Sequence, residues 1–166
     1  MNREWSQDDQ IELVLPLEIK VTRWYENSAA IERGPLVFAL KMKENWTKVA
    51  NDGKFGTRYG DWYYEVHSKD AWNFALLRED VEGDAPKQAF TLEETPTDAY
   101  PWNVENAPLQ IKARARMMND WKPYGGSTGP LPYSDQYQAD LGPVQEITLI
   151  PYGCTTLRIT EFPVTY

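Results

Sequence analysis

The feature that most constrains the fold is a short apolar run at residues 36–40, which reads Leu-Val-Phe-Ala-Leu and contains no polar residue. Both faces of such a segment need cover, because successive side chains of a strand point to opposite faces. Gly34 and Pro35 stand immediately before the run and are typical of a turn. A buried helix is the alternative, but this turn and the alternating segments on either side favour a strand. We therefore predict a central strand within residues 31–42.

Alternation of apolar and polar residues predicts an earlier strand, or two strands in series, over residues 11–21. Its apolar positions are Ile11, Leu13, Leu15, Leu17, Ile19 and Val21. Pro16 interrupts the ladder because proline lacks a backbone N–H. We expect an edge position, a bulge or a step between two sheets at this proline.

Further strands are predicted downstream from the same patterns. They cover residues 61–67, 73–77 and 110–117, with a closing hairpin formed by 147–150 and 155–162. Asn51, Asp52 and Gly53 predict a tight turn and hence a hairpin before residue 61. Residues 78–107 are expected to be loop with one brief strand near Phe90 and Leu92, and residues 122–143 a long loop.

The predicted fold class is all-β. No segment has a convincing helical period, no internal repeat is evident, and turn signals recur between short strands. The length of 166 residues is that of one domain. We therefore expect residues 1–166 to form a single antiparallel β-sandwich with a jelly-roll-like arrangement.

Composition excludes several classes of protein. The apolar fraction of 42% and the aromatic fraction of 13% indicate a folded chain, and no apolar run approaches membrane-spanning length. A net charge of -8 repels phosphate backbones and anionic lipid surfaces, so we expect neither nucleic acid nor a membrane as partner. Cys154 and His67 are the only residues of their types, so we expect no zinc site built from several such ligands and no cofactor. No compartment is predicted.

Candidate catalytic residues do not stand out. The acidic pairs are Asp8-Asp9, Glu79-Asp80 and Glu93-Glu94. Paired carboxylates serve glycoside hydrolysis, but solvated surface acids explain these pairs better. We interpret Cys154 as a small buried residue and His67 as structural, and we predict no catalytic residue.

Aromatic residues are the most suggestive feature for binding. The chain has seven tryptophans and ten tyrosines, whose flat rings suit the C–H faces of sugars. Trp102, Trp121 and Tyr124 lie in or beside loop-like stretches and are the candidate carbohydrate-binding residues, with packing as the alternative role. A basic stripe of Lys112, Arg114 and Arg116 could hold an anionic sugar, although pairing with acids on a neighbouring strand is the commoner use.

A family resemblance rests on the apolar run and the turn before it. Residues 33–40, Arg-Gly-Pro-Leu-Val-Phe-Ala-Leu, closely resemble the Arg-Gly-Pro-Leu-Val-Tyr-Ala-Leu signature of the β-L-arabinofuranosidase-like glycoside hydrolases, family 127. Other family-like landmarks follow the same order along nearly the whole chain. They are Trp5 with Asp9, Ile11, residues 15–17, residues 72–76, residues 107–109, Trp121, residues 149–153 and residues 157–160.

The resemblance implies the C-terminal β-sandwich that follows the catalytic (α/α)6 barrel in this family. The barrel of characterised members carries a cysteine nucleophile, a glutamate acid/base and a zinc held by cysteines and a glutamate, and none of these matches a residue here. The expected role is therefore a non-catalytic accessory domain in carbohydrate metabolism, packing against a barrel absent from this chain. We expect the chain to be a fragment or an excised domain of a larger glycoside hydrolase-like protein.

Two other functions stay open. One is a stand-alone carbohydrate-binding module that holds a plant-type oligosaccharide with exposed aromatic side chains. The other is an independent carboxylate glycosidase, which requires a cleft with two acids at hydrolase spacing.

Overall fold

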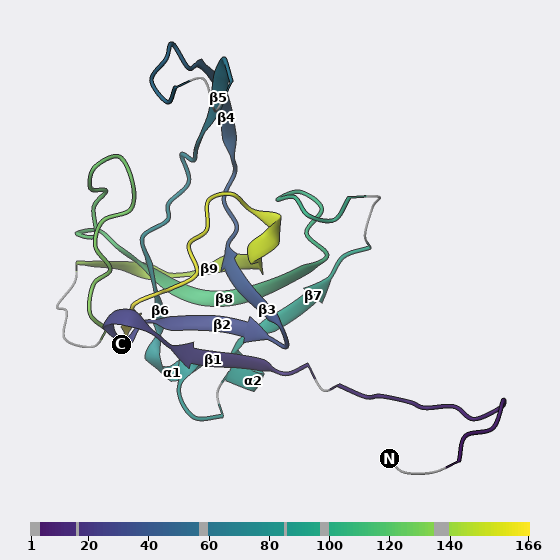
Figure 1. The fold of residues 1–166 in the computed structure, drawn as a ribbon. Helices are drawn as coiled ribbons and strands as arrows, with labels where there is room; N and C mark the ends of the chain where they lie inside the picture. Colours follow the sequence, from purple (N-terminus) through teal and green to yellow (C-terminus); the bar gives the residue numbers. More distant parts are fainter. Residues whose placement is uncertain (1–3, 16, 57–59, 85, 97–99, 135–139) are drawn as a thin grey trace.

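The computed structural model describes residues 4–15, 17–56, 60–84, 86–96, 100–134 and 140–166 (Figure 1). The strands are β1 (Ile19–Arg23), β2 (Ala29–Arg33), β3 (Leu36–Leu40), β4 (Asn45–Ala50), β5 (Trp62–His67), β6 (Phe74–Leu77), β7 (Thr91–Glu94), β8 (Leu109–Met118), β9 (Leu141–Pro151) and β10 (Val164–Thr165). In the described part of the chain, four short helical segments connect them. These are the α-helices α1 (Arg78–Val81) and α2 (Pro86–Ala89) and the 3-10 helices η1 (Tyr25–Asn27) and η3 (Tyr152–Cys154).

One curled sheet of eight strands forms the body, in the order β1-β2-β3-β9-β8-β6-β10, with β7 paired to β8. Its pairs are antiparallel except for β10, which runs parallel to β6. Strands β4 and β5 form a separate hairpin that projects from the body (Figure 1). The all-β, single-domain fold class is confirmed, although the one parallel pair was not predicted.

The predicted central strand is confirmed as β3, which lies between β2 and β9. Phe38 is fully buried in the main core and pairs with Pro151 of β9, and Leu40 pairs with Leu149. Gly34 makes the turn before the strand with a φ of +57°, a conformation that favours glycine. Both faces of the apolar run are therefore covered, as its lack of polar residues requires.

The predicted strand over residues 11–21 is wrong for its first part. Regular pairing begins only at Ile19, and the preceding arm, residues 4–18 without residue 16, runs away from the sheet (Figure 1). Leu13 and Leu15 are 77% and 67% exposed. Alternation gives a segment one apolar and one polar face, but a strand also needs a partner strand for its backbone hydrogen bonds. No described strand pairs with this arm. The expectation for Pro16 lies outside the described residues.

The predicted closing hairpin is also wrong. Strand β9 cannot take the segment 155–162 as a partner because β3 and β8 already occupy its two edges. The segment instead lies along the first strands, where Leu40 donates its N–H to Ile159 at 2.8 Å. Ala29 and Phe162 exchange two backbone hydrogen bonds of 2.8 and 2.9 Å.

Most of the remaining strand predictions agree with the structure, but β9 begins six residues before the predicted strand 147–150, within the predicted loop 122–143. Strands β5, β6 and β8 fall within one residue of their predicted ranges, and β7 is the brief strand expected near Leu92. The two α-helices in the predicted loop were missed, because four residues are too few to show a helical period. Asp52 and Gly53 have positive φ angles at the expected turn, although the whole connection between β4 and β5 is longer than a tight turn.

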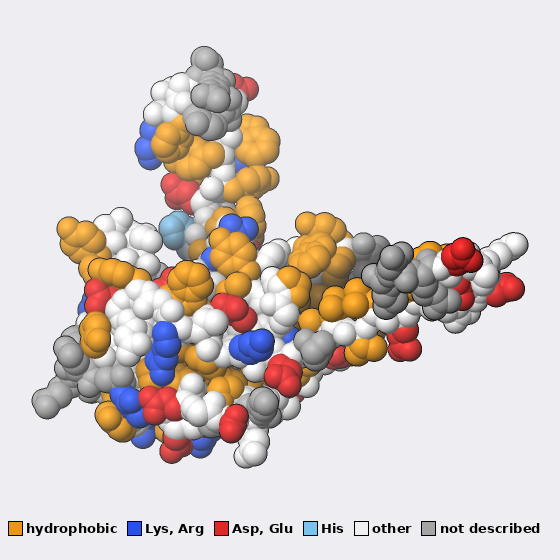
Figure 2. Space-filling view, turned by 60° about the horizontal axis from the view of Figure 1, so that its bottom comes forward, with side chains coloured by type: hydrophobic (Ala, Val, Ile, Leu, Met, Phe, Trp, Pro, Cys, Tyr) orange, Lys and Arg blue, Asp and Glu red, His pale blue; other side chains and the backbone are white. Residues whose placement is uncertain are grey.

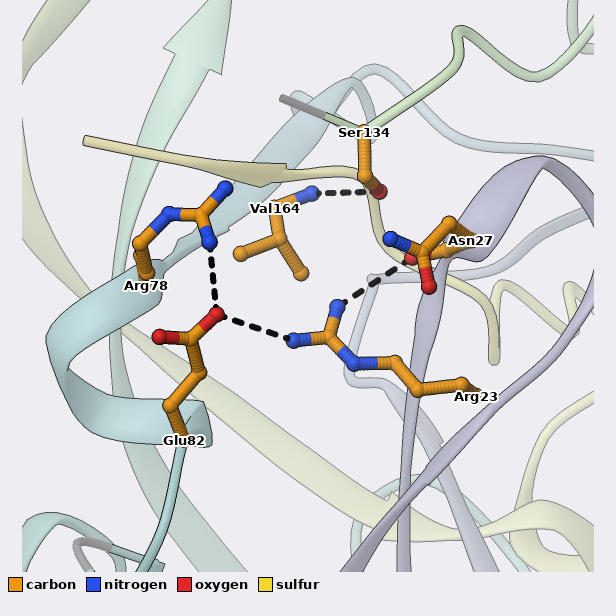
Figure 3. A network of polar contacts seen from close by, with 6 residues as sticks. All are labelled: Arg23, Asn27, Arg78, Glu82, Ser134 and Val164. Carbon is orange, nitrogen blue, oxygen red and sulfur yellow. Dashed lines mark hydrogen bonds and ion pairs between the residues drawn. The ribbon is translucent and has the colours of Figure 1, made fainter. Parts of the chain in front are cut away.

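A polar network ties the two ends of the sheet path together (Figure 3). The carboxylate of Glu82 accepts a hydrogen bond of 2.6 Å from Arg78 of α1 and lies 3.9 Å from Arg23 of β1. Buried Ser134 accepts a 3.0 Å bond from the backbone N–H of Val164 in β10. The sheet is thus curled so that β1 and β10, the two ends of its path, lie against the same connecting segments, as in a partly closed barrel.

Candidate functional site

A cavity of about 520 Å³ lies where the β4–β5 hairpin leaves the body. Three segments far apart in the sequence line it: residues 44–46 at the start of β4, residues 100–105, and residues 153–158 around the end of η3. We call it the hairpin-base cavity. Its size falls in the range of small-molecule sites, and it combines aromatic with charged side chains, as such sites do.

Glu44 holds two of these segments together. One carboxylate oxygen, Oε1, accepts hydrogen bonds from the hydroxyl of Thr155 at 2.8 Å and from the N–H of Thr156 at 2.5 Å. A longer bond of 3.4 Å comes from the N–H of Leu157. The other oxygen, Oε2, accepts a bond of 3.0 Å from the indole of Trp46. Both oxygens are thus used within the chain, which gives Glu44 a positioning role.

The third lining segment, residues 100–105, is anchored by a small apolar cluster. Val104 and Ala107 pack with Ile150 and Cys154 in a small buried cluster. The thiol of Cys154 also contacts the carbonyl oxygen of Pro101 at 3.5 Å. Loop 100–107 is therefore fixed on the end of β9 and on η3, although it carries no regular secondary structure.

Asn103 shapes this loop from within. Its side chain donates to the carbonyl of Tyr100 at 3.1 Å and accepts from the N–H of Asn106 at 2.7 Å. Side-chain bonds of this kind replace the backbone bonds that a strand or helix would provide. The loop therefore presents Tyr100 and Trp102 from a defined backbone.

Three aromatic rings border the cavity and remain open to solvent. Trp46, Tyr100 and Trp102 are 54%, 64% and 48% exposed. The ring of Trp102 lies against Gly153, where a Cβ atom would be only 3.2 Å from the ring carbon Cε3. The absence of a side chain at Gly153 therefore allows the close approach of the indole.

The cavity carries charges of both signs. Arg158 donates to the carbonyl of Thr155 at 3.1 Å, and its guanidinium lies 4.4 Å from the ring centre of Tyr152. Glu105 makes no hydrogen bond or ion pair with another described residue, and its side chain is exposed. Together with Glu44, the lining holds two carboxylates and one guanidinium.

The structure does not bring the three predicted binding residues together. Trp102 lines the hairpin-base cavity. Trp121 is 6% exposed, packs edge-on against Trp72 with ring centres 4.8 Å apart, and lines a different cavity beside Tyr25. Tyr124 is 76% exposed on a turn with Ser127 and lines neither of these two cavities.

Sequence reasoning missed Glu44, Trp46, Tyr100 and Arg158 as residues of one site. Trp46 lies in β4, six residues after the end of the central strand, and no local pattern marked it as a binding residue. Nothing local in the sequence pairs Glu44 with residues 155–157, because more than a hundred residues separate them.

The other candidate groups have ordinary structural surroundings. Cys154 is buried, and burial raises the pKa of its thiol, as expected for a structural cysteine. His67 is exposed on the hairpin, 3.7 Å from Glu65. No group of three or more His, Cys, Asp or Glu side chains suited to a metal ion occurs in the part of the chain that the structure describes.

The predicted pairing of the basic stripe with acids on neighbouring strands holds for Lys112, whereas Arg114 pairs with acids of helix α1 and Arg116 donates to the carbonyl of Gly142 at 3.1 Å. Arg114 bonds both carboxylate oxygens of buried Asp80 and lies 2.9 Å from Glu79. Lys112 donates to the hydroxyl of Thr148 at 2.9 Å and lies within 4 Å of Glu93 and Glu146.

Comparisons with known proteins identify no relative. No family model, no curated protein and no solved structure matches this chain. Within the described residues, no helix has both the length and the apolar character needed to cross a membrane. The function is therefore argued from the sequence landmarks and from the geometry.

Proposed function

We propose that this chain is a non-catalytic accessory β domain of a family 127-like glycoside hydrolase, and that it packs against a catalytic (α/α)6 barrel. The order of the family-like landmarks along nearly the whole sequence supports this proposal. In the family that they resemble, the β-sandwich follows the barrel directly.

The arm is the observation that carries the proposal. Its apolar side chains are largely exposed, with Ile11 at 66%, Leu13 at 77%, Val14 at 73% and Leu15 at 67%. Figure 2 shows hydrophobic side chains along this arm and on the projecting hairpin. Contiguous exposed apolar surface of this kind marks an interaction site, because its burial removes it from water at about 25 cal/mol per Å². A second folded body would supply that cover.

The test is reconstitution from separate parts. The barrel of a family 127 enzyme, produced without its own β-sandwich, is mixed with this chain and analysed by size-exclusion chromatography with light scattering. We expect a one-to-one complex that the double variant Leu13→Asp/Leu15→Asp does not form. Tyr124→Asp changes an equally exposed side chain outside the arm and should leave the complex intact. A wild-type chain that stays separate from the barrel would contradict the packing role.

Activity is tested on the isolated chain. We expect no turnover of arabinofuranosides with or without added zinc. Release of arabinose that follows this chain through purification, and that is absent from a mock preparation, would overturn the non-catalytic role.

A further inference from the structure

We propose that the hairpin-base cavity binds an uncharged oligosaccharide, with Trp46 and Trp102 as stacking platforms. This inference goes beyond the packing role, because it concerns a small-molecule site on a different part of the molecule from the arm. It also replaces two of the three residues expected from the sequence, since Trp121 and Tyr124 lie outside this cavity.

Two aromatic rings supply the apolar surfaces of the proposed site. Trp46 and Trp102 are each fixed at one side, the first by the bond from its indole to Glu44 and the second by contact with Gly153. About half of each side chain is nevertheless exposed. Rings held in place before binding lose little conformational freedom when a ligand arrives, which favours affinity. Flat, polarisable surfaces of this kind suit the C–H face of a sugar ring.

Polar side chains supply the hydrogen-bonding groups of the proposed site. A sugar hydroxyl both donates and accepts hydrogen bonds, so a sugar site needs both kinds of partner. In this cavity the carboxylate of Glu105 accepts and the guanidinium of Arg158 donates, while the hydroxyl of Thr156 does either. The site therefore combines apolar platforms with a few polar groups, as expected for recognition of an oriented small ligand.

Charge decides the class of sugar. Glu44 and Glu105 place two carboxylates around the cavity against the one guanidinium of Arg158. The whole chain carries a further excess of acid, with a net charge of -8. A uronic acid would meet repulsion here, whereas an uncharged pentose or hexose unit would not. The ligand is therefore assigned as a neutral oligosaccharide.

The experiment is a titration of the purified chain, followed by tryptophan fluorescence and by isothermal calorimetry. The probes are neutral arabino-, xylo- and cello-oligosaccharides, an oligogalacturonide as the anionic counterpart, and a proline-rich peptide as a different ligand that aromatic surfaces accept. We expect saturable binding of at least one neutral oligosaccharide, and weaker binding of the oligogalacturonide and of the peptide.

Variants locate the site. Trp102→Ala and Trp46→Ala should each weaken binding at least about tenfold, which corresponds to about 1.4 kcal/mol. Tyr124→Ala removes an exposed aromatic ring outside the cavity and should leave the affinity unchanged. Gly153→Ala keeps every ring and requires the indole of Trp102 to move by only a few tenths of an ångström, so it should weaken binding less than Trp102→Ala does. Circular dichroism checks that each variant is folded.

Several results would overturn the proposal. They are the absence of saturable binding by every neutral oligosaccharide, wild-type affinity in a folded Trp102→Ala variant, and preferential binding of the oligogalacturonide or the peptide. The packing role is judged separately, because Trp102→Ala leaves the arm unchanged and should still form the complex with a barrel.

Discussion

Glu44 accepts a hydrogen bond of 3.0 Å from the indole N–H of Trp46, two residues further along the chain. The other oxygen of the same carboxylate binds the segment 155–157, which follows η3. One half-buried side chain therefore joins the base of the hairpin to a distant part of the body. The position of the Trp46 ring depends on this junction, and so does the shape of the cavity beside it.

Glu44→Ala should lower the free energy of unfolding by about 1–3 kcal/mol, because backbone and hydroxyl donors lose their acceptor. Glu44→Gln should cost less, since its single carbonyl oxygen still accepts. Urea unfolding measures both. Glu105→Ala, which removes a carboxylate without a hydrogen bond to described residues, is the matched control and should stay within about 0.5 kcal/mol of wild type. Equal stability of the Glu44→Ala and Glu105→Ala variants would contradict the claim that Glu44 joins the hairpin to segment 155–157.

The pair of Arg114 and Asp80 gives a second prediction. Asp80 is 3% exposed, and hydrogen bonding to this carboxylate raises the pKa of Arg114 above its ordinary value. Arg114→Met leaves the buried carboxylate without its partner and should cost about 1–3 kcal/mol. Lys112→Met, on the same face of β8 but paired to exposed acids, should cost less than about 1 kcal/mol. Thermal and urea unfolding compare the two, and similar losses would contradict the role assigned to Asp80.

Burial of Cys154 predicts a dependence of stability on pH. Burial raises the pKa of its thiol in the folded chain, so the unfolded chain loses this proton at lower pH. Stability should therefore fall as the pH rises above the ordinary thiol pKa, at about 8.5 to 9, and Cys154→Ala should show a smaller fall. Urea unfolding over this range measures the difference. The native thiol should also react with a thiol reagent only upon unfolding, and rapid native reaction would contradict burial.

The parts of the fold that depend on a local sequence pattern could be predicted from the sequence. The apolar run 36–40 has to be covered on both faces, and β3 accordingly lies inside the sheet. The ten-residue strand β8 alternates cleanly, with Ala113 and Ala115 in the core and Arg114 on the opposite face. Such segments are predictable because burial imposes the pattern directly.

The parts of the fold that were not predicted depend on contacts with segments that are distant in the sequence. The arm has the alternation of a strand, but no described strand pairs with it. Segment 155–162 cannot pair with β9, because β3 and β8 occupy both edges of that strand. The hairpin-base cavity likewise depends on a bond between Glu44 and Thr155, which lie 111 residues apart. Trp102 was predictable as an exposed loop aromatic, whereas its neighbours in the cavity could be found only from the folded chain.

Gly129 gives the last prediction, through its close approach to the segment that precedes Tyr124. A Cβ atom at this position would lie 2.2 Å from the carbonyl oxygen of Lys122, which is backbone and cannot rotate away. The carbonyl of Gly129 also accepts the indole N–H of buried Trp121 at 3.2 Å. Gly129→Ala should therefore destabilise the chain by about 1–3 kcal/mol. The indole N–H resonance of Trp121 should shift, and its hydrogen exchange should become faster.

Gly142→Ala is the matched control for this substitution. A Cβ atom there would be 3.5 Å from the nearest atom, the Cβ of Met117, which is an ordinary contact. Its backbone is not in the left-handed region, so alanine should be neutral or slightly stabilising, by less than about 1 kcal/mol, because it restricts the unfolded chain. Equilibrium unfolding of the two variants compares a forbidden Cβ with a permitted one. If Gly129→Ala unfolds at the same urea concentration as Gly142→Ala, then loop 122–129 yields to the methyl group and does not hold Trp121 in place.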